Sequence, residues 1–178
     1  MKSQRLLLVA GVLAAMVLPN IAGCAGTAPS DGTQSGPAQP TPKLISTSDL
    51  KCLRWIEGTW RGTGDVEKPF FERYHFENDS TLVVESFSEA SLSKVDEVTR
   101  FELRDGQLSN SGEGARWVAT QLDENSITFE PVTRARNTFR WERQSENLWK
   151  AVLQWPTTGD TPAKQKVYQM ERLPSPTQ

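Results

Sequence analysis

Residues 148–155 read Leu-Trp-Lys-Ala-Val-Leu-Gln-Trp, and their side chains alternate between large apolar and polar types. The apolar face of this segment comprises Trp149, Ala151, Leu153 and Trp155. Lys150 and Gln154 fall on the opposite face. A period of two residues is that of a β-strand with one buried side and one side in water. The stretch therefore predicts a strand of an antiparallel sheet.

Nine other segments have strand character and are separated by turn residues. They cover residues 59–66, 70–77, 81–87, 97–104, 107–109, 115–122, 126–132, 138–144 and 164–172. Asp105-Gly106 gives the strongest hairpin signal, because both positions tolerate positive φ. Sequential strands with short connections predict an all-β fold, an up-and-down antiparallel barrel of about eight to ten strands. A β-sandwich is the alternative architecture.

A short helical turn is expected just before the strands. Ser48 followed by Asp49 is typical of a helix start, and Gly58 ends the segment. The apolar positions between them are Leu50, Leu53 and Ile56, at a spacing of three. Cys52 adjoins these apolar residues, so we expect it to be a small buried core residue.

The first residues differ in composition from the rest of the chain. Lys2 and Arg5 precede a nearly all-apolar run over residues 6–18, and two small residues precede Cys24. This arrangement resembles a bacterial lipoprotein signal, whose terminal cysteine becomes the acylated first residue after cleavage. The run is shorter than the roughly 20 residues that a membrane-spanning helix needs. An ordinary secretory signal is the alternative.

The lipoprotein resemblance divides the chain into four parts. Residues 1–23 are the expected signal peptide, 24–46 the lipidated Cys24 and a Pro/Gly/Ser/Thr-rich disordered tether, and 47–174 the folded domain, followed by a tail at 175–178. It implies export to the bacterial cell envelope and attachment to the membrane through the acyl chains of Cys24. Because Ala25 follows the cysteine, the periplasmic face of the outer membrane is implied for a two-membrane cell.

The charge balance argues against nucleic acid as a partner. The chain has 20 Lys and Arg against 22 Asp and Glu, and removing Lys2 and Arg5 leaves a net charge of −4. Nucleic-acid binding calls for a basic stripe, and none is present in the sequence.

Residues 58–64, Gly-Thr-Trp-Arg-Gly-Thr-Gly, resemble the opening of the calycin barrels, which include lipocalins, fatty-acid-binding proteins and nitrobindin-like haem barrels. The resemblance implies that Trp60 crosses the barrel floor beneath a helical plug. It also implies a lumen that binds a small apolar or amphipathic molecule. Residues 55–60, 129–130 and 140–143 are similar to an uncharacterised lipocalin-like group of exported bacterial proteins.

Lys166-Val167-Tyr168 resembles the Arg-x-Tyr pair with which fatty-acid-binding proteins hold a carboxylate. Period two places Lys166 and Tyr168 on one face, where both could donate to an anionic head group. Arg140, beside Trp141, is a second candidate for a cation in the cavity. The expected ligand-binding residues are Trp60, Arg140, Trp141, Lys166 and Tyr168. The alternative leaves Lys166 in water and Tyr168 in the wall.

The sequence offers no catalytic or metal signature. The nitrobindin-like group ligates haem through a histidine on the last strand, whereas the one histidine here is His75, so haem is disfavoured. No Gly-x-Ser-x-Gly elbow, P-loop or metal-ligand cluster appears. We therefore expect no catalytic residue, metal or cofactor. The main alternative to a ligand carrier is a filled barrel whose loops, residues 132–137 and 156–163, meet an envelope partner.

Overall fold

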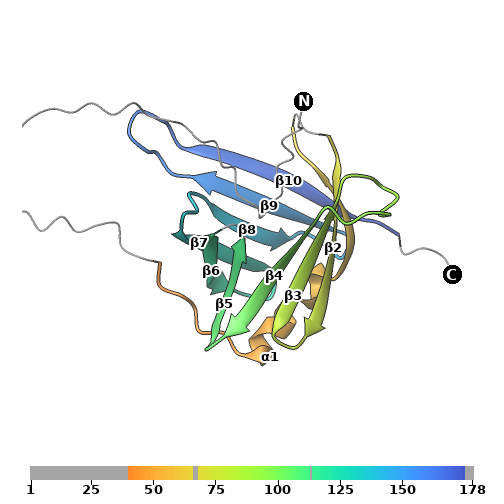
Figure 1. Ribbon diagram of the computed structural model, residues 1–178, viewed down its shortest axis with the longest axis horizontal. Coiled ribbons are helices and arrows are strands. Elements are labelled where there is room, and N and C mark those ends of the chain that lie inside the picture. Colours follow the sequence, from red (N-terminus) through yellow and green to blue (C-terminus); the bar gives the residue numbers. More distant parts are fainter. Residues whose placement is uncertain (1–39, 66–67, 113, 175–178) are drawn as a thin grey trace, which may run out of the picture.

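The computed structural model describes residues 40–65, 68–112 and 114–174. Ten strands form a closed antiparallel barrel in which each strand pairs with its neighbours in the sequence (Figure 1). Pairing of the first strand with the last closes the cylinder. The predicted up-and-down barrel is therefore confirmed, and the sandwich is excluded. The expected signal peptide, Cys24 and most of the tether lie outside the described residues.

The strands follow the predicted order. They are β1 (Gly58–Thr63), β2 (Phe70–Asn78), β3 (Thr81–Phe87), β4 (Glu97–Arg104), β5 (Gln107–Gly112), β6 (Ala115–Leu122), β7 (Ser126–Thr133), β8 (Thr138–Arg143), β9 (Leu148–Trp155) and β10 (Lys164–Arg172). Asp105 and Gly106 have φ values of 49° and 74°, as the predicted hairpin requires. β5 is longer than predicted, because pairing with β4 and β6 extends it through polar residues that carry no alternation signal.

A two-part helical segment closes one end of the barrel. Helix α1 (Thr47–Leu50) begins with a capping box in which Ser46 and Asp49 bond each other's backbone, and the 3₁₀ helix η1 (Lys51–Ile56) follows. Three residues per turn place the apolar positions on the barrel side. Cys52 lies on the other side and is exposed, so its predicted burial is wrong. No helix among the described residues is long and apolar enough to cross a membrane.

Arg172, at the end of β10, fastens this helical plug to the barrel. Its guanidinium donates to the carbonyls of Glu57 (2.7 Å) and Trp55 (3.0 Å), and lies 4.1 Å from the ring centroid of Trp60. The Trp60 indole nitrogen donates to the last carbonyl of η1 at 2.7 Å. Gly58 has a φ of 124°, and a side chain there would collide with Arg172. Trp60 thus lies at the barrel floor, as the calycin resemblance implied.

Aromatic side chains fill much of the interior above the plug. The largest buried rings are Trp60, Trp141, Trp149, Tyr74, Tyr168, Phe101, Phe129 and Phe139. Neighbouring ring centroids within this set lie 4.6–6.4 Å apart, mostly in edge-to-face arrangements. The part of the barrel next to the plug is therefore a packed core. We call the opposite end, where β2 begins and β3 ends, the mouth.

Candidate functional site

A carboxylic acid is buried in the inner wall of the barrel. Glu72 on β2 is 1% exposed and shares the inward face of its strand with Tyr74. It is paired in register with Trp60 on β1 and with Ser86 on β3. The Tyr74 hydroxyl donates to Glu72 Oε2 at 2.5 Å. Glu72 therefore lies inside the barrel between β1 and β3, away from water.

Burial dominates the acidity of this group. Removal from water raises the pKa of Glu72 to about 7, although hydrogen bonds from Tyr74 and Ser86 oppose the rise. The negative charge of Glu97 adds to the rise. Burial, followed by the neighbouring carboxylate, also raises the pKa of the Tyr74 hydroxyl well above its ordinary value. Glu72 can therefore gain or lose a proton near neutral pH.

Glu72 belongs to a row of inward-facing polar residues on four consecutive strands, β2 to β5. We call this row the polar arc; its members are Glu72, Ser86, Thr99 and Asn110. On each strand, the arc residue lies two positions nearer the mouth than a core residue that points inward from the same strand. Those core residues are Tyr74, Val84, Phe101 and Leu108. Barrel strands tilt by about 35–45° relative to the barrel axis. Because of this tilt, residues whose register shifts gradually from one strand to the next lie at similar heights along that axis.

Asn110 is the least satisfied member of the polar arc. Its side chain is buried at 2% exposure, and neither Oδ1 nor Nδ2 has a hydrogen-bond partner among the described residues. Trp117, opposite Asn110 on β6, directs its indole N–H to the Asn137 carbonyl instead (2.8 Å). An unpaired buried polar group costs about 1–3 kcal/mol, so native proteins rarely retain one without a reason. Asn110 therefore offers an unused donor and an unused acceptor inside the barrel.

The structure brings together only some of the residues predicted to bind a ligand. Lys166 and Tyr168 share the inward face of β10, with Lys166 Nζ 5.3 Å from the Tyr168 ring centroid. Tyr168 meets Phe70 of β2 edge-to-face at 5.3 Å, near the mouth. Trp60 and Trp141 instead belong to the packed core. The binding roles of all four remain predictions.

Arg140 does not enter the cavity. It alternates with the buried Phe139 and Trp141 on β8, so its guanidinium lies on the outer wall, 3.4 Å from Thr128 Oγ1 and 3.6 Å from Glu142 Oε2. Its expected position as a cavity cation is thus corrected. Neighbouring residues of a strand point to opposite faces, so Arg140 points outward because Trp141 points inward.

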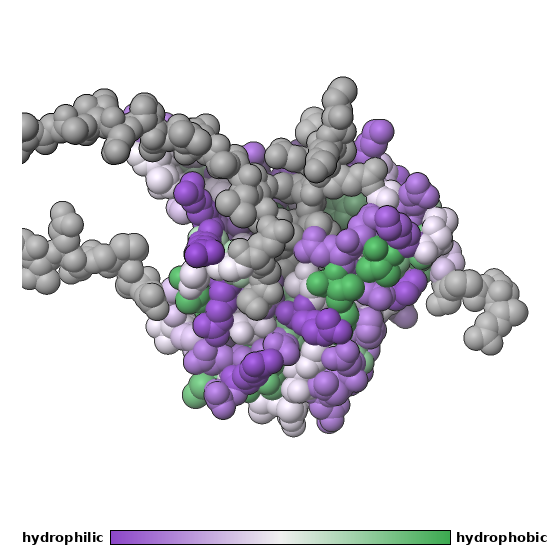
Figure 2. All heavy atoms as spheres, in the orientation of Figure 1, coloured by the Kyte–Doolittle hydropathy of each residue, from purple (hydrophilic) through white to green (hydrophobic). Residues whose placement is uncertain are grey.

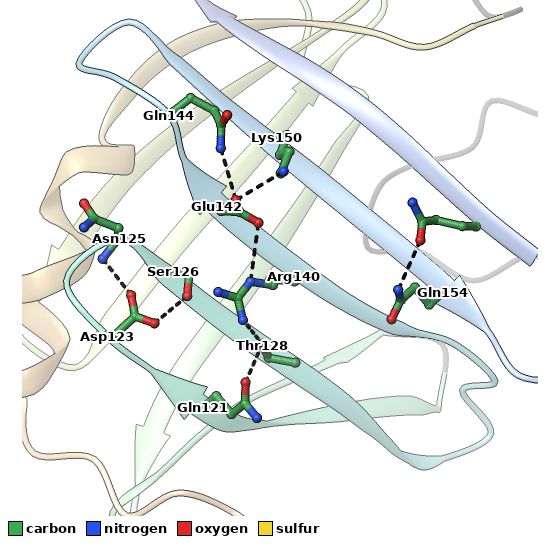
Figure 3. A network of polar contacts seen from close by, with 11 residues as sticks. Gln121, Asp123, Asn125, Ser126, Thr128, Arg140, Glu142, Gln144, Lys150 and Gln154 are labelled. Atoms are coloured by element: carbon green, nitrogen blue, oxygen red, sulfur yellow. Dashed lines mark hydrogen bonds and ion pairs between the residues drawn. The ribbon is translucent and has the colours of Figure 1, made fainter.

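Arg140 lines an open groove of about 420 Å³ on the outer wall, between the β6–β7 and β8–β9 turns. Figure 3 shows that the polar groups of this groove are largely bonded to one another. Asp123 accepts from Ser126 at 2.7 Å, while Glu142 accepts from Lys150 at 3.2 Å and Gln144 at 3.2 Å. These polar side chains of the groove therefore already have hydrogen-bond partners in one another. It is therefore a weaker candidate for ligand binding than the polar arc.

The outer surface shows mainly polar character on the face in Figure 2, with separate hydrophobic patches. The large hydrophobic residues that are exposed in the described part of the chain are Leu44, Val95 and Val98. Single apolar residues on a surface need no functional explanation. Within residues 40–65, 68–112 and 114–174, no group of three or more His, Cys, Asp and Glu side chains could hold a metal ion.

Sequence reasoning missed the polar arc. One signal was present: strand 70–77 has aromatic or charged residues on both faces, which is irregular for a strand with one wet side. The buried position of Glu72 could not be derived from that irregularity. Asn110 gave no signal, because it lies in the polar end of β5, just beyond the strand predicted at residues 107–109.

Comparisons with known proteins give no functional assignment. No family model matches the chain, and no curated protein matches it. Among solved structures, the complex of EF1p2_mFAP2b with DFHBI is 13% identical, with a TM-score of 0.34, covering 72% of this chain and 100% of that one. A redesigned β-barrel is 10% identical, with a TM-score of 0.33, covering 75% and 100%. Likeness at this level does not bear on function, and the barrel architecture rests on the strand pairing itself.

Proposed function

We propose that the barrel binds a small apolar or amphipathic molecule at its mouth, with a polar group of the ligand at the polar arc. The observation that carries this proposal is Asn110, a buried amide whose donor and acceptor are both unpaired. Sites for small molecules combine apolar walls with a few placed polar groups. The aromatic core below the arc supplies such walls. The calycin resemblance of residues 58–64 supports the same type of activity.

Partly exposed inward positions indicate how a ligand would enter. Thr99 shares its face of β4 with buried Phe101, yet it is only half-buried. Glu97, two residues nearer the mouth on the same face, is also half-buried and is paired with Ser86. Water therefore reaches the inner wall at Thr99, within the polar arc, and at Glu97 above it. A ligand following that path would meet Asn110 and Glu72 before it met the packed rings.

A filled barrel acting as a protein-interaction module is the second candidate. The close contacts among the large buried rings next to the plug favour it, because they leave less room for a ligand. In this case the loops at residues 132–137 and 156–163 would contact the partner. Drug-sized ligands occupy cavities of about 300–1,000 Å³, so a smaller lumen would favour this candidate.

We further propose that the protein is a lipoprotein of the bacterial cell envelope, attached through acylated Cys24. The support is the pattern of residues 1–24, a basic start, an apolar run and small residues before the cysteine. Metabolic labelling with an alkyne fatty acid tests it. Wild type should incorporate the label, and Cys24→Ser should not; equal labelling of both would refute the anchor.

Binding is tested with the neutral dye N-phenyl-1-naphthylamine, whose fluorescence rises in apolar surroundings. We expect saturable binding by the wild type. Thr99→Phe, which places a bulky ring within the polar arc itself, should weaken binding at least about tenfold without changing the outer wall. Arg140→Gln serves as the control and should bind like wild type, because Arg140 lies outside the barrel. No binding by wild type, or equal binding by Thr99→Phe, would refute the proposal.

A further inference from the structure

We propose that the ligand of the barrel carries a compact cation, in the simplest case a primary ammonium group attached to an apolar body, which pairs with Glu72. This inference rests on the proposed binding function and assigns the chemistry of the ligand. It follows from two features of Glu72: its hydrogen-bond donors are hydroxyl groups, and no basic side chain among the described residues forms an ion pair with it.

Among the described residues, the hydrogen-bond donors to Glu72 are neutral. They are the hydroxyl groups of Tyr74, at 2.5 Å, and Ser86. No ion pair joins Glu72 to a basic side chain within the described ranges of the chain. Burying a carboxylate without a cation costs several kcal/mol. A ligand cation would supply the missing charge.

A second carboxyl group strengthens the preference for a cation. Glu97 on β4 is paired in register with Ser86, which is itself paired with Glu72. The two acidic residues thus flank Ser86 on the inner wall, and the charge of Glu97 is felt at Glu72. Lys166 lies on β10, with its Nζ 5.3 Å from the ring centroid of Tyr168. The inner wall at β2 to β4 is therefore acidic.

Asn110 adds a second acceptor that fits an ammonium group. Such a group has three N–H donors and no acceptor, so one carboxylate cannot satisfy it. The unpaired Oδ1 of Asn110 lies on the same arc as Glu72. Aromatic rings below the arc attract cations through their faces and bury an apolar body. A primary amine with an alkyl or aryl body matches all three features.

The pairing makes binding depend on pH. The groups facing Glu72 are Trp60 on β1, Tyr74 on its own strand, Ser86 on β3 and Glu97 on β4. Of these, Glu97 and Tyr74 can also ionise. An ammonium ion binds best when Glu72 is ionised. Amine affinity should therefore fall as pH drops from 8 to 6, through the pKa of about 7 for Glu72.

Isothermal titration with two matched series tests the inference. One series is octylamine, octanol and octanoate; the other is phenethylamine, 2-phenylethanol and 3-phenylpropanoate. At pH 8 the amine of a series should bind at least about tenfold more tightly than its alcohol. Glu72→Gln should remove that difference. The matched control is Glu85→Gln, on the outer face of β3 and paired with Arg73, which should preserve it.

The outcomes separate the two proposals. If alcohols or carboxylates bind as tightly as amines, the cation inference is overturned while the binding function stands. If no member of either series binds, both are overturned. Should Glu72→Gln fail to fold, wild type alone decides: amine affinity must fall between pH 8 and pH 6 while alcohol affinity stays constant. Equal pH dependence for amine and alcohol would overturn the inference.

Discussion

The buried carboxyl group of Glu72 should make the ligand-free protein less stable as pH rises. Its pKa is about 7 in the folded protein, against an ordinary value of 4.5. A raised folded pKa means that the stabilising contribution is complete below the unfolded value and is lost as pH rises through the folded value. The loss should therefore occur between about pH 4.5 and pH 7.

The size of this effect follows from the two pKa values. The interval between 4.5 and about 7 corresponds to about 3 kcal/mol of unfolding free energy once Glu72 is fully ionised. Glu72 is only 1% exposed, so water screens it little. A loss of this size is a large part of the 5–15 kcal/mol typical of a domain. It should be visible as a clear fall in the urea midpoint.

Urea unfolding, followed by tryptophan fluorescence at pH 5, 6, 7, 8 and 9, measures the effect. Wild type should lose about 2.5 kcal/mol over this range, since Glu72 is already partly ionised in the unfolded chain at pH 5, and Glu72→Gln, which cannot ionise, should lose little. Glu85→Gln keeps the buried acid and should lose as much as wild type. Comparing variants removes effects of overall charge that all three share. A flat wild-type profile, or a slope retained in Glu72→Gln, would refute the reasoning.

Three other predictions concern the plug and the core. Arg172→Met should lower the unfolding free energy by about 2–4 kcal/mol, because its charged hydrogen bonds and its stacking on the Trp60 indole are lost. Arg61→Met is the control: Arg61 forms an exposed ion pair, and its loss should cost less than about 1 kcal/mol. Similar losses for both in urea titrations would show that Arg172 does not fasten the plug. Trp149→Ala should cost about 3–5 kcal/mol in the same assay, because it leaves a cavity among packed rings; a cost under 1 kcal/mol would mean that the core is loose. Cys52 should react fully with a maleimide in the native state, and protection until urea unfolds the protein would contradict its exposure.

The fold was largely accessible from the sequence because its signals are local. Alternation in residues 148–155 and the Asp105-Gly106 turn depend only on neighbouring residues, and both predictions are confirmed. The end of β5 and the side on which Cys52 lies were predicted wrongly. The first depends on pairing with other strands, and the second on the helix being 3₁₀, with three residues per turn.

The candidate site was less accessible because it depends on which face of each strand points inward. Arg140 and Trp141 are neighbours, so the sequence could suggest both for the cavity, yet a strand can turn only one of them inward. Glu72 and Asn110 come from strands that are not adjacent. Their common position follows from barrel closure and strand tilt, which no local pattern encodes.

The central claim is that the mouth of this barrel holds a small molecule. Native mass spectrometry of the full-length protein, purified from its own cells under non-denaturing conditions, is the most direct test. We expect an extra mass of a few hundred daltons that leaves on collisional activation, and that is much reduced in Thr99→Phe but retained in Arg140→Gln. A wild-type protein that consistently carries no extra mass, or an equal mass on Thr99→Phe, would contradict it.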